Sequence, residues 1–146
     1  AQFFIEQGFA LTGIDGSQKM INLAQHRFPQ HRFIATDMRH LDLGEKFRAI
    51  IAWHSLFHLP VADQRQMFSI ITKHLKPGGI FVMTTGDAAG EIWGNNGGEA
   101  LYHASLSLQD YRELLRIHHF EILNHCVRDP ACGHATIWVT RYQDYS

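Results

Sequence analysis

Residues 11–17, Leu-Thr-Gly-Ile-Asp-Gly-Ser, constrain the fold of this chain more than any other segment. An apolar strand pattern ends there on the carboxylate of Asp15, and Ser17 follows where a helix N-cap belongs. Parallel α/β sheets hold the ribose hydroxyls of nucleotide-like ligands with an acidic side chain at the carboxyl end of a strand. The segment therefore predicts such a sheet, with Asp15 as the first candidate binding residue.

The residues before this strand lack the turn that such an acid normally has upstream. A Gly-rich strand-to-helix turn belongs about 20 residues before the acid, and the ten residues before Leu11 leave no room for it. They instead predict the last turns of a helix, with Gly8 as a left-handed C-cap and Phe9 folding back after it. We therefore expect a fold that lacks its first strand.

Composition limits the class of protein. With 146 residues and a hydrophobic content of 45%, the chain suffices for one globular domain, residues 1–146. The 13 basic and 14 acidic residues do not favour nucleic-acid binding. No apolar run approaches membrane-spanning length, and the first residues do not form a secretory signal. Cys126 and Cys132 match neither a disulfide framework nor a zinc site, which favours free thiols and a cytoplasmic protein.

Strand and helix patterns alternate along the rest of the chain. The predicted strands are 32–37, 47–53, 80–85, 120–127 and 135–139, and the predicted helices are 18–28, 63–74 and 108–117. The almost unbroken apolar run of 47–53 is typical of a strand buried on both faces of a parallel sheet. The last two strands are joined too tightly for a helix, so they predict an antiparallel hairpin at one edge of the sheet.

Residues 86–104 differ in composition from the segments around them. They contain five glycines and the isolated large rings of Trp93, Tyr102 and His103. Long segments of this kind inside compact domains are usually lids or binding loops. We expect a loop that covers a binding site.

Four sequence blocks carry a resemblance to a known family. They are residues 12–17 with Met20, residues 36–38, residues 47–55, and the Leu-Lys-Pro-Gly-Gly segment at 75–79. The chain resembles the class I S-adenosylmethionine-dependent methyltransferases over nearly its whole length. The resemblance implies a doubly wound, mostly parallel, Rossmann-like sheet with an antiparallel edge hairpin at the C-terminus. The family's first strand and Gly-rich loop are missing from this chain.

The resemblance also implies roles for individual residues toward S-adenosyl-L-methionine. Asp15 would contact the ribose hydroxyls, and Gly16, Ser17 and Met20 would line the ribose and adenine edge. Asp37 and Met38 would contact the adenine ring. The methionyl and sulfonium end would face Trp53, His54 and Ser55. Asp15 has a simpler interpretation as an acid that favours a helix dipole. The second acid at the next strand end, Asp37, favours binding.

The missing strand leaves three expectations open. The chain is a fragment of a longer product, the flanking strands pair directly, or a partner chain supplies the strand. An open sheet edge makes a homodimer plausible. We favour the first of the three.

Methyl transfer needs alignment of donor and acceptor, and a base only where the acceptor must lose a proton. His54, His58 and His103 are the candidate bases, although histidines in a chain with 11 of them are more often structural. Trp93, Tyr102 and His103 are candidates for contacting a small-molecule acceptor. The H-x-x-x-H spacing of His54 and His58 suits a metal pair, but Pro60 and the lack of a third ligand argue against it, and we assign no metal.

Two other functions compete with methyl transfer. A nicotinamide-dependent reductase also carries an acid after its second strand, but residues 75–79 and the terminal hairpin argue against it, and there is no Tyr-x-x-x-Lys pair. A non-catalytic methyltransferase-like remnant, acting as a binding or assembly module, is the alternative from a different class. The acceptor atom is not indicated by the sequence.

Overall fold

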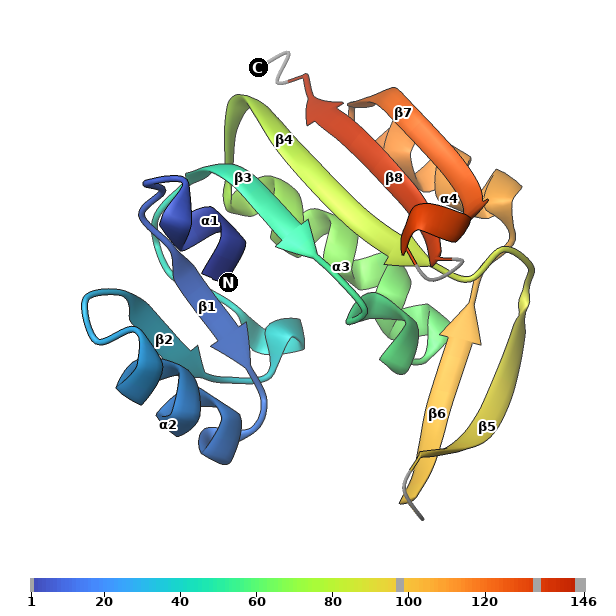
Figure 1. Ribbon diagram of the computed structural model, residues 1–146. Coiled ribbons are helices and arrows are strands. Elements are labelled where there is room, and N and C mark those ends of the chain that lie inside the picture. The colour runs from blue at the N-terminus through green and yellow to red at the C-terminus, as the bar shows by residue number, and fades with distance from the viewer. Residues whose placement is uncertain (1, 97–98, 133–134, 144–146) are drawn as a thin grey trace. The chain divides into compact units, whose positions relative to one another are not determined.

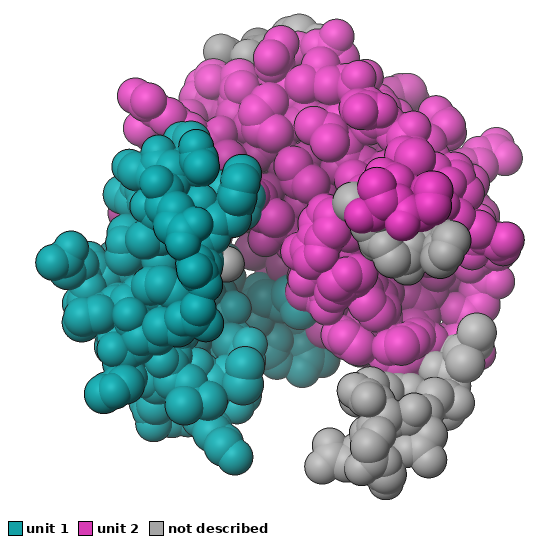
Figure 2. All heavy atoms as spheres, in the orientation of Figure 1, with its two compact units in different colours: residues 1–42 teal, residues 43–146 magenta. Residues whose placement is uncertain are grey.

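The computed structural model describes residues 2–96, 99–132 and 135–143 (Figure 1). The contacts between residues divide the chain into two compact units, residues 1–42 and residues 43–146 (Figure 2). The strands of the two units form separate sheets. None of the described helices is long and apolar enough to cross a membrane.

The first unit contains a two-stranded parallel sheet. Its elements are α1 (Gln2–Glu6), β1 (Thr12–Asp15), α2 (Gln18–Arg27), β2 (Arg32–Ala35) and the 3₁₀ helix η1 (Met38–His40). Strands β1 and β2 pair in register from Thr12 opposite Arg32 to Asp15 opposite Ala35. The predicted strand, helix and strand are confirmed.

The end of α1 has the predicted cap. Gly8 has a φ of 86°, a left-handed conformation that glycine adopts without steric cost. Its N–H donates to the Ile5 carbonyl at 3.0 Å, and the N–H of Phe9 donates to the Phe4 carbonyl at 3.1 Å. These two bonds and the Phe4–Phe9 ring contact form a Schellman motif with its hydrophobic closure.

The second unit contains a four-stranded mixed sheet and a separate hairpin. The sheet order is β3-β4-β8-β7, in which β3 and β4 are parallel and β8 is antiparallel to both of its neighbours. The elements are β3 (Phe47–Ala52), η2 (Leu56–His58), α3 (Val61–Lys73), β4 (Leu75–Thr85), β5 (Gly90–Asn96), β6 (Glu99–Ser105), α4 (Leu108–Ile117), β7 (Phe120–Asp129), η3 (Pro130–Cys132) and β8 (Ala135–Tyr142). The predicted antiparallel hairpin at the sheet edge is confirmed, with β8 inserted between β4 and β7.

The core of the second unit lies between this sheet and its helices. The side chains of Phe68, Phe81, Tyr111 and Trp138 are fully buried. The indole Nε1 of Trp138 donates to Thr85 Oγ1 at 2.9 Å, so the one polar atom of this large ring is satisfied. Helices α3 and α4 therefore present apolar faces to the sheet, as their spacing predicts.

The prediction that residues 47–53 are buried on both faces is wrong. The side chain of Ile51 is 40% exposed and that of Trp53 is 43% exposed. Strand β3 ends its sheet and pairs with β4 alone among the described strands. An edge strand has no neighbour to cover one side, so an apolar run does not guarantee burial. Among the described strands, β1 likewise pairs with β2 alone.

Two further boundaries differ from the predictions. Strand β4 begins at Leu75, because the Lys76–Gly79 turn forms an irregularity within the strand, with Gly78 at a φ of 78°. Residues 86–104 are not an irregular loop, since most of them form the antiparallel hairpin β5–β6. The apolar and aromatic residues between the glycines suffice for cross-strand pairing. The high glycine content instead favoured the prediction of a loop.

Candidate functional site

The two predicted carboxylates of the first unit lie at neighbouring strand ends. Asp15 is the last residue of β1, and Asp37 follows β2 by two residues. The strands are parallel, with Asp15 opposite Ala35, and the N–H of Thr36 donates to the Asp15 carbonyl at 2.9 Å. The structure therefore brings both acids to the carboxyl edge of one sheet, as the sequence predicts.

The carboxylate of Asp15 is exposed and shapes the turn that follows it. Its Oδ1 accepts a hydrogen bond from the Ser17 N–H at 2.8 Å. Ser17 in turn caps α2, with its Oγ accepting from the Met20 N–H at 3.3 Å. Apart from its neighbours in the chain, no atom lies within 4 Å of a Cβ built on Gly16, and the Met20 side chain is 54% exposed. The backbone next to this exposed carboxylate is therefore open to a ligand.

The carboxylate of Asp37 is engaged by a neighbouring cation. Its Oδ1 accepts from the N–H of Arg39 at 2.9 Å, which caps η1, and the Arg39 side chain pairs with both carboxylate oxygens. The hydrogen bonds from Arg39 lower the pKa of Asp37 to about 2, so it is ionised at neutral pH. The half-buried Met38 lies next to it in the chain. Asp37 therefore has a clear structural role, and its contact with adenine stays a prediction.

In the second unit, Trp53, His54 and Ser55 follow the carboxyl end of β3. The N–H of His54 donates to the buried Oγ1 of Thr84 at 2.7 Å. His54 has a φ of 50°, a conformation that is uncommon for non-glycine residues and is found most often at turns and functional sites. The exposure of Trp53 excludes a role as a core residue. The hydrogen bond from His54 to Thr84 therefore ties the turn that carries Trp53, His54 and Ser55 to strand β4.

The three candidate histidines are connected through Phe57. The ring centroids of His54 and Phe57 are 5.8 Å apart, and those of Phe57 and His103 are 5.0 Å apart. The rings of His58 and His103 are also 5.0 Å apart. The turn before η2, η2 itself and β6 thus contribute to one cluster of rings. We call it the imidazole cluster, and it consists of His54, Phe57, His58 and His103.

The hydrogen bond of His58 determines its tautomer. Its Nδ1 lies 3.2 Å from the Tyr102 carbonyl oxygen, which only accepts, so Nδ1 carries a proton. In the neutral ring, Nε2 then holds the lone pair that a general base needs. Burial and a hydrogen bond with Glu91 raise the pKa of Tyr102. The phenol of Tyr102 is therefore neutral and is not a base at neutral pH.

The structure does not support a metal pair on one helical face. His54 precedes η2, while His58 is its last residue. Among the described residues, no group of three or more His, Cys, Asp or Glu side chains is arranged to hold a metal. The side chain of Trp93 lies outside the described part of the structure, and only the pairing of its backbone with Tyr102 is described.

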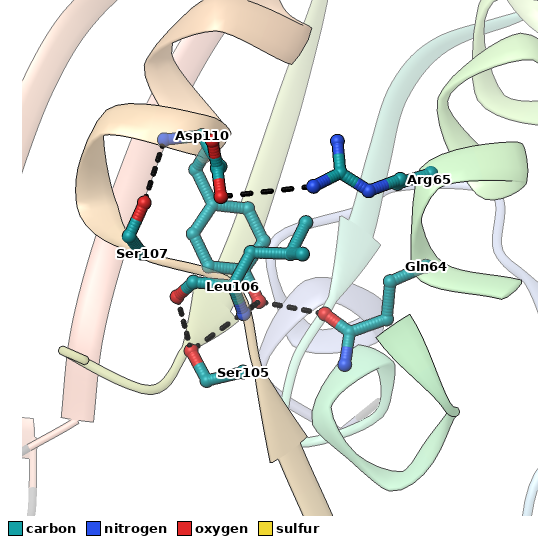
Figure 3. A network of polar contacts seen from close by, with 7 residues as sticks. Gln64, Arg65, Ser105, Leu106, Ser107 and Asp110 are labelled. Atoms are coloured by element: carbon teal, nitrogen blue, oxygen red, sulfur yellow. Dashed lines mark hydrogen bonds and ion pairs between the residues drawn. The ribbon is translucent and has the colours of Figure 1, made fainter. Parts of the chain in front are cut away.

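Sequence reasoning missed two buried polar residues, Gln64 and Tyr111, and Figure 3 shows the polar contacts around Gln64. Gln64 of α3 is 1% exposed and Tyr111 of α4 is fully buried, and the Tyr111 hydroxyl donates to Gln64 Oε1 at 2.6 Å. The sequence did contain a signal for Gln64. It lies three and four residues before Met67 and Phe68, on the apolar face of its helix, where an amide requires buried partners.

A family profile described as "Methyltransferase domain" matches residues 1–79, more than half of the chain. This chain belongs to the methyltransferase-domain family. The match includes both carboxylates, β3 and the turn with His54. No curated protein sequence matches the chain.

Solved structures share the methyltransferase fold. A 1,6-didemethyltoxoflavin-N1-methyltransferase from Burkholderia thailandensis is 24% identical with a TM-score of 0.75 over 98% of this chain. A SAM-dependent methyltransferase from Methanosarcina mazei is 14% identical, with a TM-score of 0.82, and the match covers 97% of this chain and 86% of that one. CalS10, an amino pentose methyltransferase from Micromonospora echinaspora, is 18% identical, with a TM-score of 0.72 over 92% of this chain and 74% of that one. The chain spans 65% of the Burkholderia enzyme, which was crystallised with S-adenosylhomocysteine.

Proposed function

We propose that this chain belongs to an enzyme that transfers a methyl group from S-adenosylmethionine to a small-molecule acceptor. The observation that carries the proposal is the pair of carboxylates at neighbouring strand ends, within the residues that match the methyltransferase-domain family. S-adenosylmethionine, when bound, supplies an electrophilic methyl group on a sulfonium. The protein's task is then alignment of the two reactants and exclusion of water.

The residues of the first unit fit the nucleoside part of this cofactor. An exposed, ionised carboxylate accepts two hydroxyl hydrogen bonds well, and Asp15 has open space beside it at Gly16. Its bond to Ser17 fixes the carboxylate without filling its acceptor capacity. Asp15 would hold the ribose, with Gly16, Ser17 and Met20 along the ribose and adenine edge. Asp37 and Met38 would contact the adenine.

The residues of the second unit supply acceptor-side chemistry. Trp53, His54 and Ser55 would line the methionyl and sulfonium end. In its neutral form, His58 has a free lone pair on Nε2, which would take the acceptor's proton if methylation requires its loss. The rings of Phe57 and His103 beside it form an aromatic wall that suits a small organic molecule.

Two observations support a small acceptor. The net charge of −1 does not favour nucleic acid, and two structural neighbours carry names of enzymes that act on 1,6-didemethyltoxoflavin and on an amino pentose. A homodimer through an exposed sheet edge, and a cytoplasmic location, remain predictions from the sequence. Light scattering at increasing protein concentration tests the dimer.

Calorimetric titration of the full-length protein with S-adenosylhomocysteine tests the proposal. Asp15→Ala should weaken binding by more than about 1.5 kcal/mol, which is about tenfold, because a charged acceptor of hydrogen bonds is lost. Asp15→Asn is the matched control, since it keeps an oxygen for the Ser17 N–H but removes the charge. Unchanged affinity in Asp15→Ala contradicts the ribose assignment. No binding by the wild type favours the non-catalytic alternative.

A further inference from the structure

The hairpin β5–β6 needs an anchor at its base. Two-stranded hairpins are only marginally stable alone, and β6 has β5 as its ladder partner on one edge. His103 is a residue of β6, so the position of its imidazole depends on how this hairpin is held. The contacts on the second edge of β6 therefore decide the geometry of the imidazole cluster.

Side chains take the place of a neighbouring strand on that second edge. His58 Nδ1 donates to the Tyr102 carbonyl at 3.2 Å, and Gln64 Nε2 donates to the Ala104 carbonyl at 2.8 Å. Tyr102 and Ala104 are two residues apart on an extended strand, so their carbonyls point to the same side. His103 lies between these two held residues.

The same amide group of Gln64 also holds η2. Its Nε2 donates to the Leu59 carbonyl at 2.9 Å, and Leu59 directly follows His58. One side chain thus ties the residue after His58 to the residue after His103. The amide is 1% exposed, where a hydrogen bond is not replaced by water and an unpaired group is costly.

The oxygen of Gln64 is held as well, which fixes the amide orientation. The Tyr111 hydroxyl donates to Gln64 Oε1 at 2.6 Å and accepts from the Leu106 N–H at 3.1 Å. Since the Leu59 and Ala104 carbonyls only accept, the amide NH₂ faces them, and the amide oxygen faces the Tyr111 hydroxyl, which donates its one proton to it. Figure 3 shows Gln64 beside the Ser105–Leu106 segment that ends β6.

We propose that Gln64 is a positioning residue of the acceptor site, whose amide NH₂ links the Leu59 and Ala104 carbonyls and thereby keeps the His58 and His103 rings in contact. The assignment of these two rings to the acceptor side rests on the proposed function. The link itself consists of contacts within the second unit. Displacement of a reacting group by about 1 Å can reduce a rate about 100-fold, so such a link bears directly on catalysis.

Nuclear magnetic resonance of the full-length protein tests this link without cofactor. In the wild type, the His58 and His103 rings should show cross-relaxation, because their centroids are 5.0 Å apart, and both Gln64 amide protons should exchange slowly. Gln64→Met fills the same space without donors and should abolish the ring contact. Rapid exchange of the Gln64 amide protons in the wild type, or a persistent ring contact in Gln64→Met, overturns the proposal.

Two further variants separate positioning from general destabilisation. Thr140→Val removes a fully buried hydrogen bond to the Phe81 carbonyl, which involves none of the partners of Gln64, and should keep the ring contact at a comparable loss of melting temperature. Tyr111→Phe leaves both N–H donors of the Gln64 amide in place and should also keep the contact between the His58 and His103 rings. Loss of the contact in all three variants would show a structural role only. Because these spectra are recorded without S-adenosylhomocysteine, their outcome is independent of cofactor binding.

Discussion

The strand ends of the first unit and the base of the β5–β6 hairpin hold their polar groups in opposite ways. Asp15 and Asp37 each accept a hydrogen bond from the backbone two residues ahead, at the surface. Gln64 instead bonds Ala104 and Tyr111, which are 40 and 47 residues away, in a buried environment. Local contacts leave a carboxylate accessible to a ligand, whereas distant buried contacts fix the relative position of elements.

Substitution of a glycine in each region should give the largest difference in the free energy of unfolding between the two. A Cβ on Gly86 would lie 2.6 Å from Ser105 Cβ, at the base of the hairpin, whereas a Cβ on Gly16 meets no atom within 4 Å. Gly86→Ala should therefore lower the free energy of unfolding by about 1–3 kcal/mol through overpacking. Gly16→Ala should change it much less. Urea unfolding of both variants measures this, and equal losses would contradict the close packing of the hairpin base.

Removal of a helix-capping serine should cause a smaller loss of stability, of similar size in both units. Ser17 caps α2 and Ser107 caps α4, each with its Oγ accepting from the N–H three residues ahead. Ser17→Ala and Ser107→Ala should each reduce the free energy of unfolding by about 1 kcal/mol, because a cap bond is local wherever the helix lies. Thermal unfolding of the two variants checks this. A much larger loss for Ser107→Ala would show that this cap also supports the buried network around Tyr111.

The smallest effect should come from Asp37 and should depend on pH. Arg39 lowers the pKa of Asp37 from 3.8 to about 2, so the pair contributes stability above about pH 4 and loses it as the pH falls toward 2. Both side chains are exposed, which makes the contribution small and sensitive to salt. Urea unfolding across this pH range should show a weaker acid loss for Asp37→Asn than for the wild type. If the two proteins lose stability identically with falling pH, the ion pair between Asp37 and Arg39 does not stabilise the fold.

Features set by short segments were predicted well from the sequence. The helix Leu108–Ile117 has the predicted ends, Gly8 closes α1 as expected, and Asp15 ends β1. Each depends on residues that are neighbours in the chain, such as a capping serine or a glycine that accepts a positive φ. The methyltransferase family was recognised for the same reason, since its motifs are short segments at strand ends.

Features that depend on distant neighbours were predicted wrongly or missed. The apolar residues of β3 do not indicate that the strand ends its sheet, and the glycines of 86–104 do not indicate cross-strand pairing. The partners of the Gln64 side chain come from three separate places in the chain: Leu59 directly after η2, Ala104 in β6 and Tyr111 in α4. Periodicity along one helix shows that such an amide needs partners but does not identify them.

By itself, the sequence determined the family of this protein, the strand ends that carry its acids, and the caps of its helices, because those properties arise from residues adjacent in the chain. Only the tertiary structure decided which strand lies at an edge, that residues 90–96 and 99–105 pair as antiparallel strands, and that His54, His58 and His103 share one cluster. These properties require strands and helices distant in sequence to pack together, and the hydrogen bonds that hold them form only in the interior that this packing creates.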